Sequence, residues 1–396
     1  DIQEMLKSLK AEFVELFHRN NNILKKNKLM TKNIRHVLGI SGGKDSAALA
    51  MYMKTNHPEI DMEYYFSDTG KELDETYALI NELENFLGKE ITPLEAIDYQ
   101  GNPFDHYLKL YNGFLPSSMA RWCTKKLKLE PFEKWIGDDL AISYVGIRDD
   151  EDREGYVSTK SNIQSVFPFR KHIWSMEILH KVLHNSNRDK IAKLYEKHAK
   201  PGLLDRIIEI TLEPQSQKYL FSQKLNDLLQ LGIASFNHVV FDFIKDKNFP
   251  VSQLQSYSLL ENEDSVKLDD VFNIFKDNGV KVPAYYDEIE FEVDGQKGVY
   301  HRSRSGCFFC FYQRKIEWIW LYERHPELFK AAQEYEKEGY SWMDNETLEE
   351  IIQPERMAQI KLDYIATLKK KLNNNKSNKL VDIFADDAEV CANCFI

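Results

Sequence analysis

Hydrophobic positions along the chain form short apolar runs, separated by longer stretches of mixed character. The runs predict β-strands at 34–40, 63–67, 90–94 and 141–147. Two of the intervening segments, 46–54 and 72–87, are predicted to be helices. Because strands that alternate with helices of this length are typical of parallel sheets, the pattern predicts an α/β fold with a doubly wound, mainly parallel sheet.

The rest of the chain is predicted to be mainly helical. Apolar residues from Met5 to Phe17 recur with a helical period and predict an amphipathic helix that packs on the domain after it. Few strand signals occur between 174 and 266, which indicates an inserted helical subdomain that either stabilises the fold or selects the substrate. Further helices are predicted at 269–275, 314–323, 326–338 and 354–372.

These changes in pattern divide the chain into four predicted regions. The α/β domain is expected to span 1–170 and the helical insertion 171–268. Residues 269–372 are expected to complete the site with a loop that carries a CxxC pair and with C-terminal helices. Residues 373–396 are expected to form a polar linker and a tail with a second CxxC pair.

Composition and charge narrow the class of protein. The hydrophobic share of 43% is ordinary for a soluble globular protein, and no apolar run approaches the roughly 18 residues that span a bilayer. The first residues are charged and give no sign of a signal peptide, so we expect a cytoplasmic protein without a membrane partner. The formal net charge of -11 argues against a large non-specific grip on nucleic acid, although it leaves room for a local basic patch.

A glycine-rich loop joins the first predicted strand to the first predicted helix. Its residues are Ser41, Gly42, Gly43, Lys44, Asp45 and Ser46. Open α/β sheets bind ligands at such loops, and glycines let backbone N–H groups approach a phosphate closely. The helix start adds a positive dipole end, and the lysine and the two hydroxyls suit phosphate oxygens. Asp45 is expected to hold a magnesium ion or to fix the loop.

The spacing of this loop differs from that of a Walker A loop, which reads GxxxxGK[ST]. It resembles instead the PP-loop, whose family cleaves ATP between the α and β phosphates. The resemblance implies that ATP and Mg²⁺ bind at Ser41–Ser46.

Four further segments resemble phosphoadenylylsulfate reductases, one branch of the PP-loop family. They are Phe66–Glu72, Arg121–Lys128, Gly146–Arg148 with Arg153, and Gly306–Cys310. The resemblance implies that Asp68, Thr69 and Gly70 lie near the nucleotide, at the end of the second strand. The candidate catalytic residues are Lys44, Asp45, Ser46, Arg148 and Arg153.

Three departures from the reductases favour a different subfamily. Position 124 is threonine, so Cys123 has no adjacent cysteine, and the C-terminal cysteines lack the reductases' glutamate–cysteine–glycine context. The intact SGGKDS loop also suggests that ATP itself is hydrolysed. These features resemble the ATP pyrophosphatases of DNA phosphorothioation systems, the DndC and SspD type.

This resemblance implies that a DNA backbone phosphate is adenylated and then receives sulfur. It also implies that partner proteins help to bind the DNA and that a cysteine desulfurase donates the sulfur. The alternatives are a sulfonucleotide reductase, a tRNA-thiolating enzyme and a regulatory nucleotide-binding module with a structural zinc.

Three of the five cysteines are candidate metal ligands. Cys123, Cys307 and Cys310 meet if the CxxC loop folds back beside the segment that holds Cys123, and three thiolates suit a [4Fe–4S] cluster with one open iron. A tetrahedral zinc site is the competing interpretation, and three buried structural thiols are the third. Cys391 and Cys394 are interpreted as a mobile persulfide carrier, a source of the fourth ligand, or an incidental exposed pair.

Overall fold

The computed structural model describes residues 34–151, 158–337 and 339–374. The predicted N-terminal helix, Arg153, and the tail with Cys391 and Cys394 lie outside these ranges. Within them, no helix combines the length and the apolar character needed to cross a membrane.

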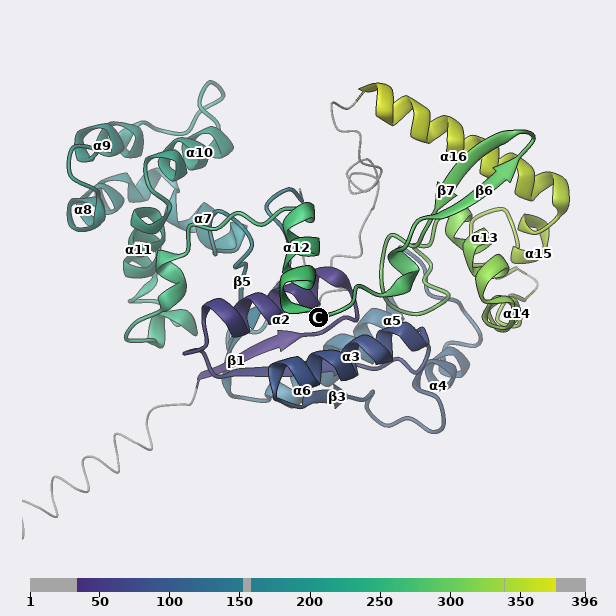
Figure 1. Ribbon diagram of the computed structural model, residues 1–396. Helices are drawn as coiled ribbons and strands as arrows, with labels where there is room; N and C mark the ends of the chain where they lie inside the picture. Colours follow the sequence, from purple (N-terminus) through teal and green to yellow (C-terminus); the bar gives the residue numbers. More distant parts are fainter. Residues whose placement is uncertain (1–33, 152–157, 338, 375–396) are drawn as a thin grey trace, which may run out of the picture.

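Five parallel strands form the central sheet, in the order β3-β2-β1-β4-β5 (Figure 1). They are β1 (Ile34–Gly39), β2 (Met62–Ser67), β3 (Ile91–Leu94), β4 (Leu140–Tyr144) and β5 (Ile163–Val166). The first four lie where the apolar runs predicted strands, so the predicted parallel α/β fold is confirmed. The pattern did not predict β5, because two of its four residues are polar although all four are buried.

Alternate side chains of the strands face two layers of helices. The helices between these strands are α2 (Lys44–Asn56), α3 (Asp74–Leu87), α4 (Pro103–Leu110), α5 (Trp122–Thr124) and α6 (Glu130–Ile136). Of these, α4 and α5 pack in the second core cluster with the C-terminal elements. Leu38 and Tyr64 belong to the core cluster that includes α2 and α3, whereas Val37 and Tyr65 pack with α6. Cover on both faces is typical of a doubly wound sheet, whose ligands bind at the carboxyl ends of the strands.

The chain from residue 174 to residue 278 is helical, as the sequence predicted for 174–266 and 269–275. Its helices are α7 (Met176–Val182), α8 (Arg188–His198), α9 (Leu204–Leu212), α10 (Phe221–Leu231), α11 (Ile233–Ile244) and α12 (Leu268–Asn278). Figure 1 shows α8 to α11 grouped together on the side of the sheet where β5 lies. Their apolar residues share one core cluster with the sheet, so the insertion and the sheet are joined by continuous packing.

A second core cluster holds the C-terminal part together. Its elements are β6 (Ile289–Val293), β7 (Gln296–Tyr300), α13 (Lys315–Arg324), α14 (Pro326–Gln333), α15 (Leu348–Ile351) and α16 (Pro354–Asn374). The prediction that α14 extends to residue 338 was wrong, because the chain turns earlier and Lys337 pairs with Tyr340 in a short antiparallel bridge. The division of the chain at residues 170, 268 and 372 stays a prediction.

The antiparallel hairpin of β6 and β7 was missed although its sequence carries a turn signal. Asp294 and Gly295 connect the strands, with φ of 48° and 70°. A two-residue Asp-Gly turn with both φ angles positive has the twist that antiparallel strands need. The turn signal was therefore local, and β6 (IEFEV) also alternates apolar and polar residues, whereas β7 (QKGVY) shows no such alternation.

Candidate functional site

The glycine loop lies at the switch point of the sheet. It follows β1, which pairs with β2 on one side and with β4 on the other. Connections leave β1 and β4 toward opposite edges of the sheet, and open α/β sheets bind ligands in the crevice at this point. Helix α2 begins at Lys44, so the N–H groups of its first turn have no acceptor within the helix and lie at the end of the loop.

Gly42 has a backbone conformation that favours glycine, with φ of 73°. A side chain there would also approach Thr76 Cγ2 to 2.3 Å. The Tyr285 hydroxyl donates a 2.6 Å hydrogen bond to the Gly42 carbonyl, and the Tyr286 hydroxyl accepts one of 3.4 Å from the Lys44 backbone N–H. These two tyrosines border the loop from the C-terminal part of the chain, and the sequence pattern gave no signal for them.

Hydroxyl groups fix the shape of the loop. Ser46 Oγ accepts the Ser41 N–H at 3.1 Å, lies 3.0 Å from Ser41 Oγ and donates to the Gly43 carbonyl at 3.2 Å. A Cβ atom on Gly43 would lie 2.7 Å from the hydroxyl of Ser305, just before the CxxC pair. The loop that follows β7 therefore reaches the glycine loop directly.

Lys44, Asp45 and Arg148 form a buried ion-pair cluster at the start of α2. Arg148 Nη1 lies 2.6 Å from Asp45 Oδ1, and Lys44 Nζ lies 3.2 Å from Asp45 Oδ2. Arg148 also pairs with Asp150 at 2.9 Å and with Glu151 at 3.2 Å. Since three carboxylates surround the Arg148 guanidinium, this residue is placed to hold Asp45 and the loop after β4 in position.

The charges of this cluster are stable in the folded chain. Burial would raise the pKa of Asp45, but Lys44 and Arg148 outweigh it and lower that pKa to about 2. Burial would likewise lower the pKa of Lys44, but the Asp45 carboxylate outweighs it and the pKa is raised. The Lys44 ammonium, 4.9 Å from the centroid of the Tyr286 ring, is therefore a permanent cation beside the loop.

Gly146 lets the loop after β4 approach the glycine loop. A Cβ atom at this position would lie 2.9 Å from the Asp45 carbonyl oxygen. We expect Gly146→Ala to push the two loops apart and to lower the free energy of unfolding by about 1–3 kcal/mol, measured by urea denaturation. Nucleotide turnover should fall as well. Gly279→Ala is the matched control, because its strain comes only from a φ of 67° in open space, and equal loss of turnover in both variants would contradict the assignment.

Asp68, Thr69 and Gly70 follow β2, as the resemblance implied. Asp68 Oδ1 accepts hydrogen bonds of 2.7 Å from the Gly70 N–H and 2.9 Å from the Tyr77 hydroxyl. Asn102 Nδ2 donates to the Gly70 carbonyl at 3.0 Å, which holds the turn in place. The half-exposed Asp68 carboxylate keeps its Oδ2 without a hydrogen bond to any described residue, so it can take an additional ligand.

Thr69 links this turn to the CxxC loop. Its hydroxyl donates a 2.8 Å hydrogen bond to Glu72 Oε1 and lies 3.1 Å from Cys307 Sγ. Burial raises the pKa of the Glu72 carboxyl, and burial followed by the Glu72 charge raises the pKa of the Cys307 thiol. Arg302, fully buried, donates from Nη2 to the Cys307 carbonyl at 3.1 Å, so it orders the loop from behind.

The three predicted metal-ligand cysteines are not assembled into a metal site. Among residues 34–151, 158–337 and 339–374, no group of three or more His, Cys, Asp or Glu side chains is positioned to hold a metal ion. The CxxC loop docks on the turn after β2, where Phe308 N–H donates to the Lys71 carbonyl at 2.9 Å, and Cys307 contacts Thr69 there. Cys123, Cys307 and Cys310 therefore stay a predicted ligand set for a [4Fe–4S] cluster or a zinc ion, and we assign no chemical step to either.

The Glu72 carboxylate is expected to control the reactivity of Cys307. Glu72→Gln removes the charge that raises the pKa of this thiol, so Cys307 should be alkylated faster, by roughly tenfold for each unit by which its pKa falls. Mass spectrometry of the Cys307 peptide after iodoacetamide treatment at pH 8 measures the rate. Glu75→Gln, in the first turn of α3 three residues after Glu72, is the control, and equal rates in the two variants would count against the coupling.

Several known proteins are similar to this chain over the sheet and its loops. Residues 35–200 match the family model described as the phosphoadenosine phosphosulfate reductase domain. Two uncharacterized proteins of Methanocaldococcus jannaschii are similar: one is 31% identical over 41% of this chain and 33% of its own length, the other 24% identical over 66% of this chain and 64% of its own length. The chain thus spans between a third and two thirds of these relatives.

A solved structure of phosphoadenylyl-sulfate reductase from Candida auris is also similar, with 16% sequence identity and a TM-score of 0.27. The similarity covers 39% of this chain and 71% of that one. The match to the family model covers all five strands of the sheet, the glycine loop, the turn after β2 and the loop after β4.

Proposed function

We propose that this chain, which carries a phosphoadenosine phosphosulfate reductase-like domain at residues 35–200, is an ATP pyrophosphatase that activates an acceptor oxygen for sulfur transfer. One observation carries the proposal: the glycine loop at the switch point is fixed to the loop after β4 by the 2.6 Å contact of Arg148 with Asp45. A rigid loop of small residues at the start of α2 is suited to a triphosphate, because its N–H donors are already in place.

The residues divide into those that bind and those that position. Lys44 is the cation at the loop and is expected to neutralise charge on the triphosphate. Asp45 is engaged by Lys44 and Arg148, so its expected role is to fix the loop. Asp68 is the better candidate to hold Mg²⁺, because its carboxylate is half-exposed and a carboxylate oxygen is available.

The proposed reaction has two steps. A non-bridging oxygen of a DNA backbone phosphate attacks the α-phosphorus of ATP, and pyrophosphate leaves. The terminal sulfur of a persulfide, carried by a cysteine desulfurase, then attacks the activated phosphorus and displaces AMP. A thiol finally cleaves the remaining S–S bond, which leaves sulfur on the DNA phosphate and a disulfide on the carrier. DNA as the acceptor rests on the resemblance to the DndC and SspD type.

The test is to incubate the purified chain with ATP, Mg²⁺ and DNA and to identify the nucleotide products. Pyrophosphate is expected from the first step, and an equal amount of AMP is expected once water or an added persulfide displaces it from the adenylated phosphate. ADP with phosphate, or no turnover, would refute the proposal, and sulfite release from phosphoadenylylsulfate without ATP consumption would assign the chain to the reductases. Mass spectrometry of nucleosides from DNA treated with the desulfurase and partner proteins then tests the acceptor, through phosphorothioate dinucleotides.

A further inference from the structure

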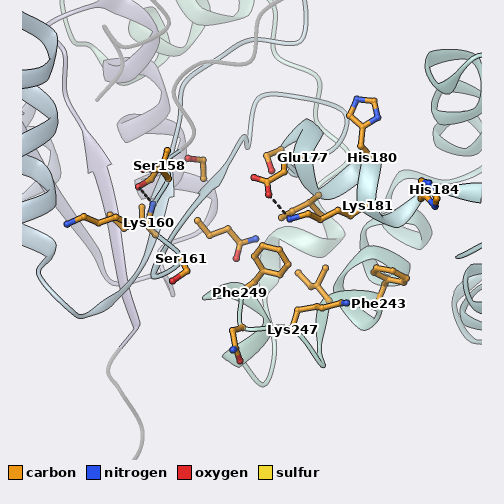
Figure 2. A pocket seen from close by; sticks show the side chains of 18 of the residues that line it. Ser158, Lys160, Ser161, Glu177, His180, Lys181, His184, Phe243, Lys247 and Phe249 are labelled. Atoms are coloured by element: carbon orange, nitrogen blue, oxygen red, sulfur yellow. Dashed lines mark hydrogen bonds and ion pairs between the residues drawn. The ribbon is translucent and has the colours of Figure 1, made fainter. Parts of the chain in front are cut away.

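We propose that a groove beside β5 binds a single strand of nucleic acid, an inference that does not depend on the ATP chemistry. The groove has a volume of about 1110 Å³. Figure 2 shows that its labelled side chains come from the segment before β5, from helix α7 and the residues after it, and from the end of α11 and the residues after it. Pockets of roughly 300–1,000 Å³ already enclose a drug-sized ligand, so this groove has room for a length of polymer.

Basic side chains border the groove although the chain as a whole is acidic, with a formal net charge of -11. Lys160, Lys181 and Lys247 stand on its rim, against the single carboxylate of Glu177. Lys181 pairs with Glu177 at 2.5 Å, and both side chains are more than half exposed. Such an exposed pair contributes little to stability, so a phosphate group can replace the carboxylate as the partner of Lys181.

Lys247 strengthens the basic character of the groove. No carboxylate among the described residues lies within ion-pair distance of it, and its side chain is exposed. Lys160 contributes less, because it pairs with Glu133 at 3.4 Å on the outer side. Two lysines, Lys181 and Lys247, therefore carry the charge complementarity to a phosphate backbone.

Aromatic rings give the groove a surface for bases. Phe249 is half-buried, and Lys181 Nζ lies 5.6 Å from the centroid of its ring. Phe243 forms part of the buried floor. Stacking of bases on aromatic rings beside cations is how proteins hold single strands, whereas a duplex keeps the faces of its bases covered. The rings therefore favour a single strand over duplex DNA.

The floor also holds a donor without a partner. Gln164 of β5 is 5% exposed, and its Oε1 accepts the Val251 N–H at 2.9 Å. Its Nε2 is buried and has no hydrogen-bond partner within the described part of the chain. An amide donor left unpaired beneath a groove costs free energy unless a ligand or water satisfies it, and base carbonyls are suitable acceptors.

The experiment measures the anisotropy of a labelled oligothymidylate of about 12 nucleotides, a length within the range of single-strand sites. The charge-reversal variant Lys181→Glu/Lys247→Glu is compared with Lys193→Glu/Lys218→Glu, which changes the net charge equally on exposed lysines of the insertion outside the groove. We expect the groove variant to bind the oligonucleotide at least tenfold more weakly. The slope of log K against log salt concentration should also become shallower by about 0.7 for each phosphate that is no longer neutralised. Phe249→Leu should weaken binding about fivefold or more.

Each other outcome overturns the proposal. The proposal is refuted if the wild-type chain does not bind the oligonucleotide, or if both double variants bind it equally weakly. It is also refuted if the matching duplex binds more tightly than the single strand. Binding of thymidine monophosphate with no gain for the oligonucleotide would assign the groove to a nucleotide, and tighter binding of a peptide with the acidic sequence of residues 381–390 would assign it to the chain's own tail. Pyrophosphate release without DNA, with water as the acceptor, should be unchanged in the groove variant, so a failure of the ATP chemistry is measured separately from a failure of strand binding.

Discussion

Replacing Arg148 with methionine is expected to lower the free energy of unfolding by about 3–5 kcal/mol, as in other buried ion pairs from which one partner is removed. Arg148 is 2% exposed, and its removal leaves the carboxylates of Asp45, Asp150 and Glu151 close together without their shared cation. Urea denaturation at pH 7 measures the change.

The pH dependence gives this prediction a definite sign. The pKa of Asp45 is lowered from its usual 3.8 to about 2, so its ionised form stabilises the fold above pH 3.8, and that stabilisation is lost as the pH falls toward 2. Part of this stabilisation comes from the attraction between the Asp45 carboxylate and the Arg148 guanidinium. The difference in unfolding free energy between the wild type and Arg148→Met should therefore shrink over the same pH range. A difference that stays constant from pH 7 to pH 2 would contradict the ion-pair explanation.

Two controls separate the ion pair from the general effect of removing a charge. Arg206→Met removes an exposed arginine of α9 and should leave the urea midpoint unchanged. In Asp45→Asn/Arg148→Met, the destabilisation should be smaller than the sum of the two single effects, because the side chains touch at 2.6 Å. Strict additivity would show that Arg148 acts independently of Asp45.

The sequence predicts those parts of the site that depend on neighbouring residues, and it misses those that depend on contacts between distant residues. The glycine loop and the turn at Asp68 were placed correctly, because each directly follows an apolar run that forms a strand. The role of Arg148 as a catalytic cation beside the nucleotide stays a prediction, and its three carboxylate partners were not predicted. Periodicity carries no information about such partners.

The long-range part of the site was out of reach. Tyr285 and Tyr286 border the glycine loop from more than 240 positions away, and nothing in their local pattern marks them. For the same reason the spacing of the CxxC pair gave no sign that the tertiary packing brings Cys307 to Thr69. The packing of the second core decides which distant segments meet. No repeating pattern in the sequence shows which segments these are.

The largest expected effect on activity is that of Lys44→Met. If Lys44 neutralises charge on the leaving pyrophosphate, its removal should lower kcat for AMP formation by about 10²–10³-fold, as for other preorganised groups that stabilise a transition state. Asp45 keeps its 2.6 Å contact with Arg148 in this variant, so no carboxylate is left buried without a partner and the fold should be retained. A coupled pyrophosphate assay at saturating ATP measures kcat, and the urea midpoint checks the fold.

Lys54→Met is the matched control for this prediction. Lys54 lies in the last turn of the same helix, is exposed, and is separated from the loop end of α2 by the length of the helix. Its replacement changes the net charge and the helix composition equally but should leave kcat unchanged. If both variants lost activity alike, the effect would come from the charge or the helix; if Lys44→Met kept full activity, the N–H groups of the glycine loop would have to bind the triphosphate without this cation. A fall in kcat confined to Lys44→Met would place the developing charge next to its ammonium group, at the N-terminal end of α2.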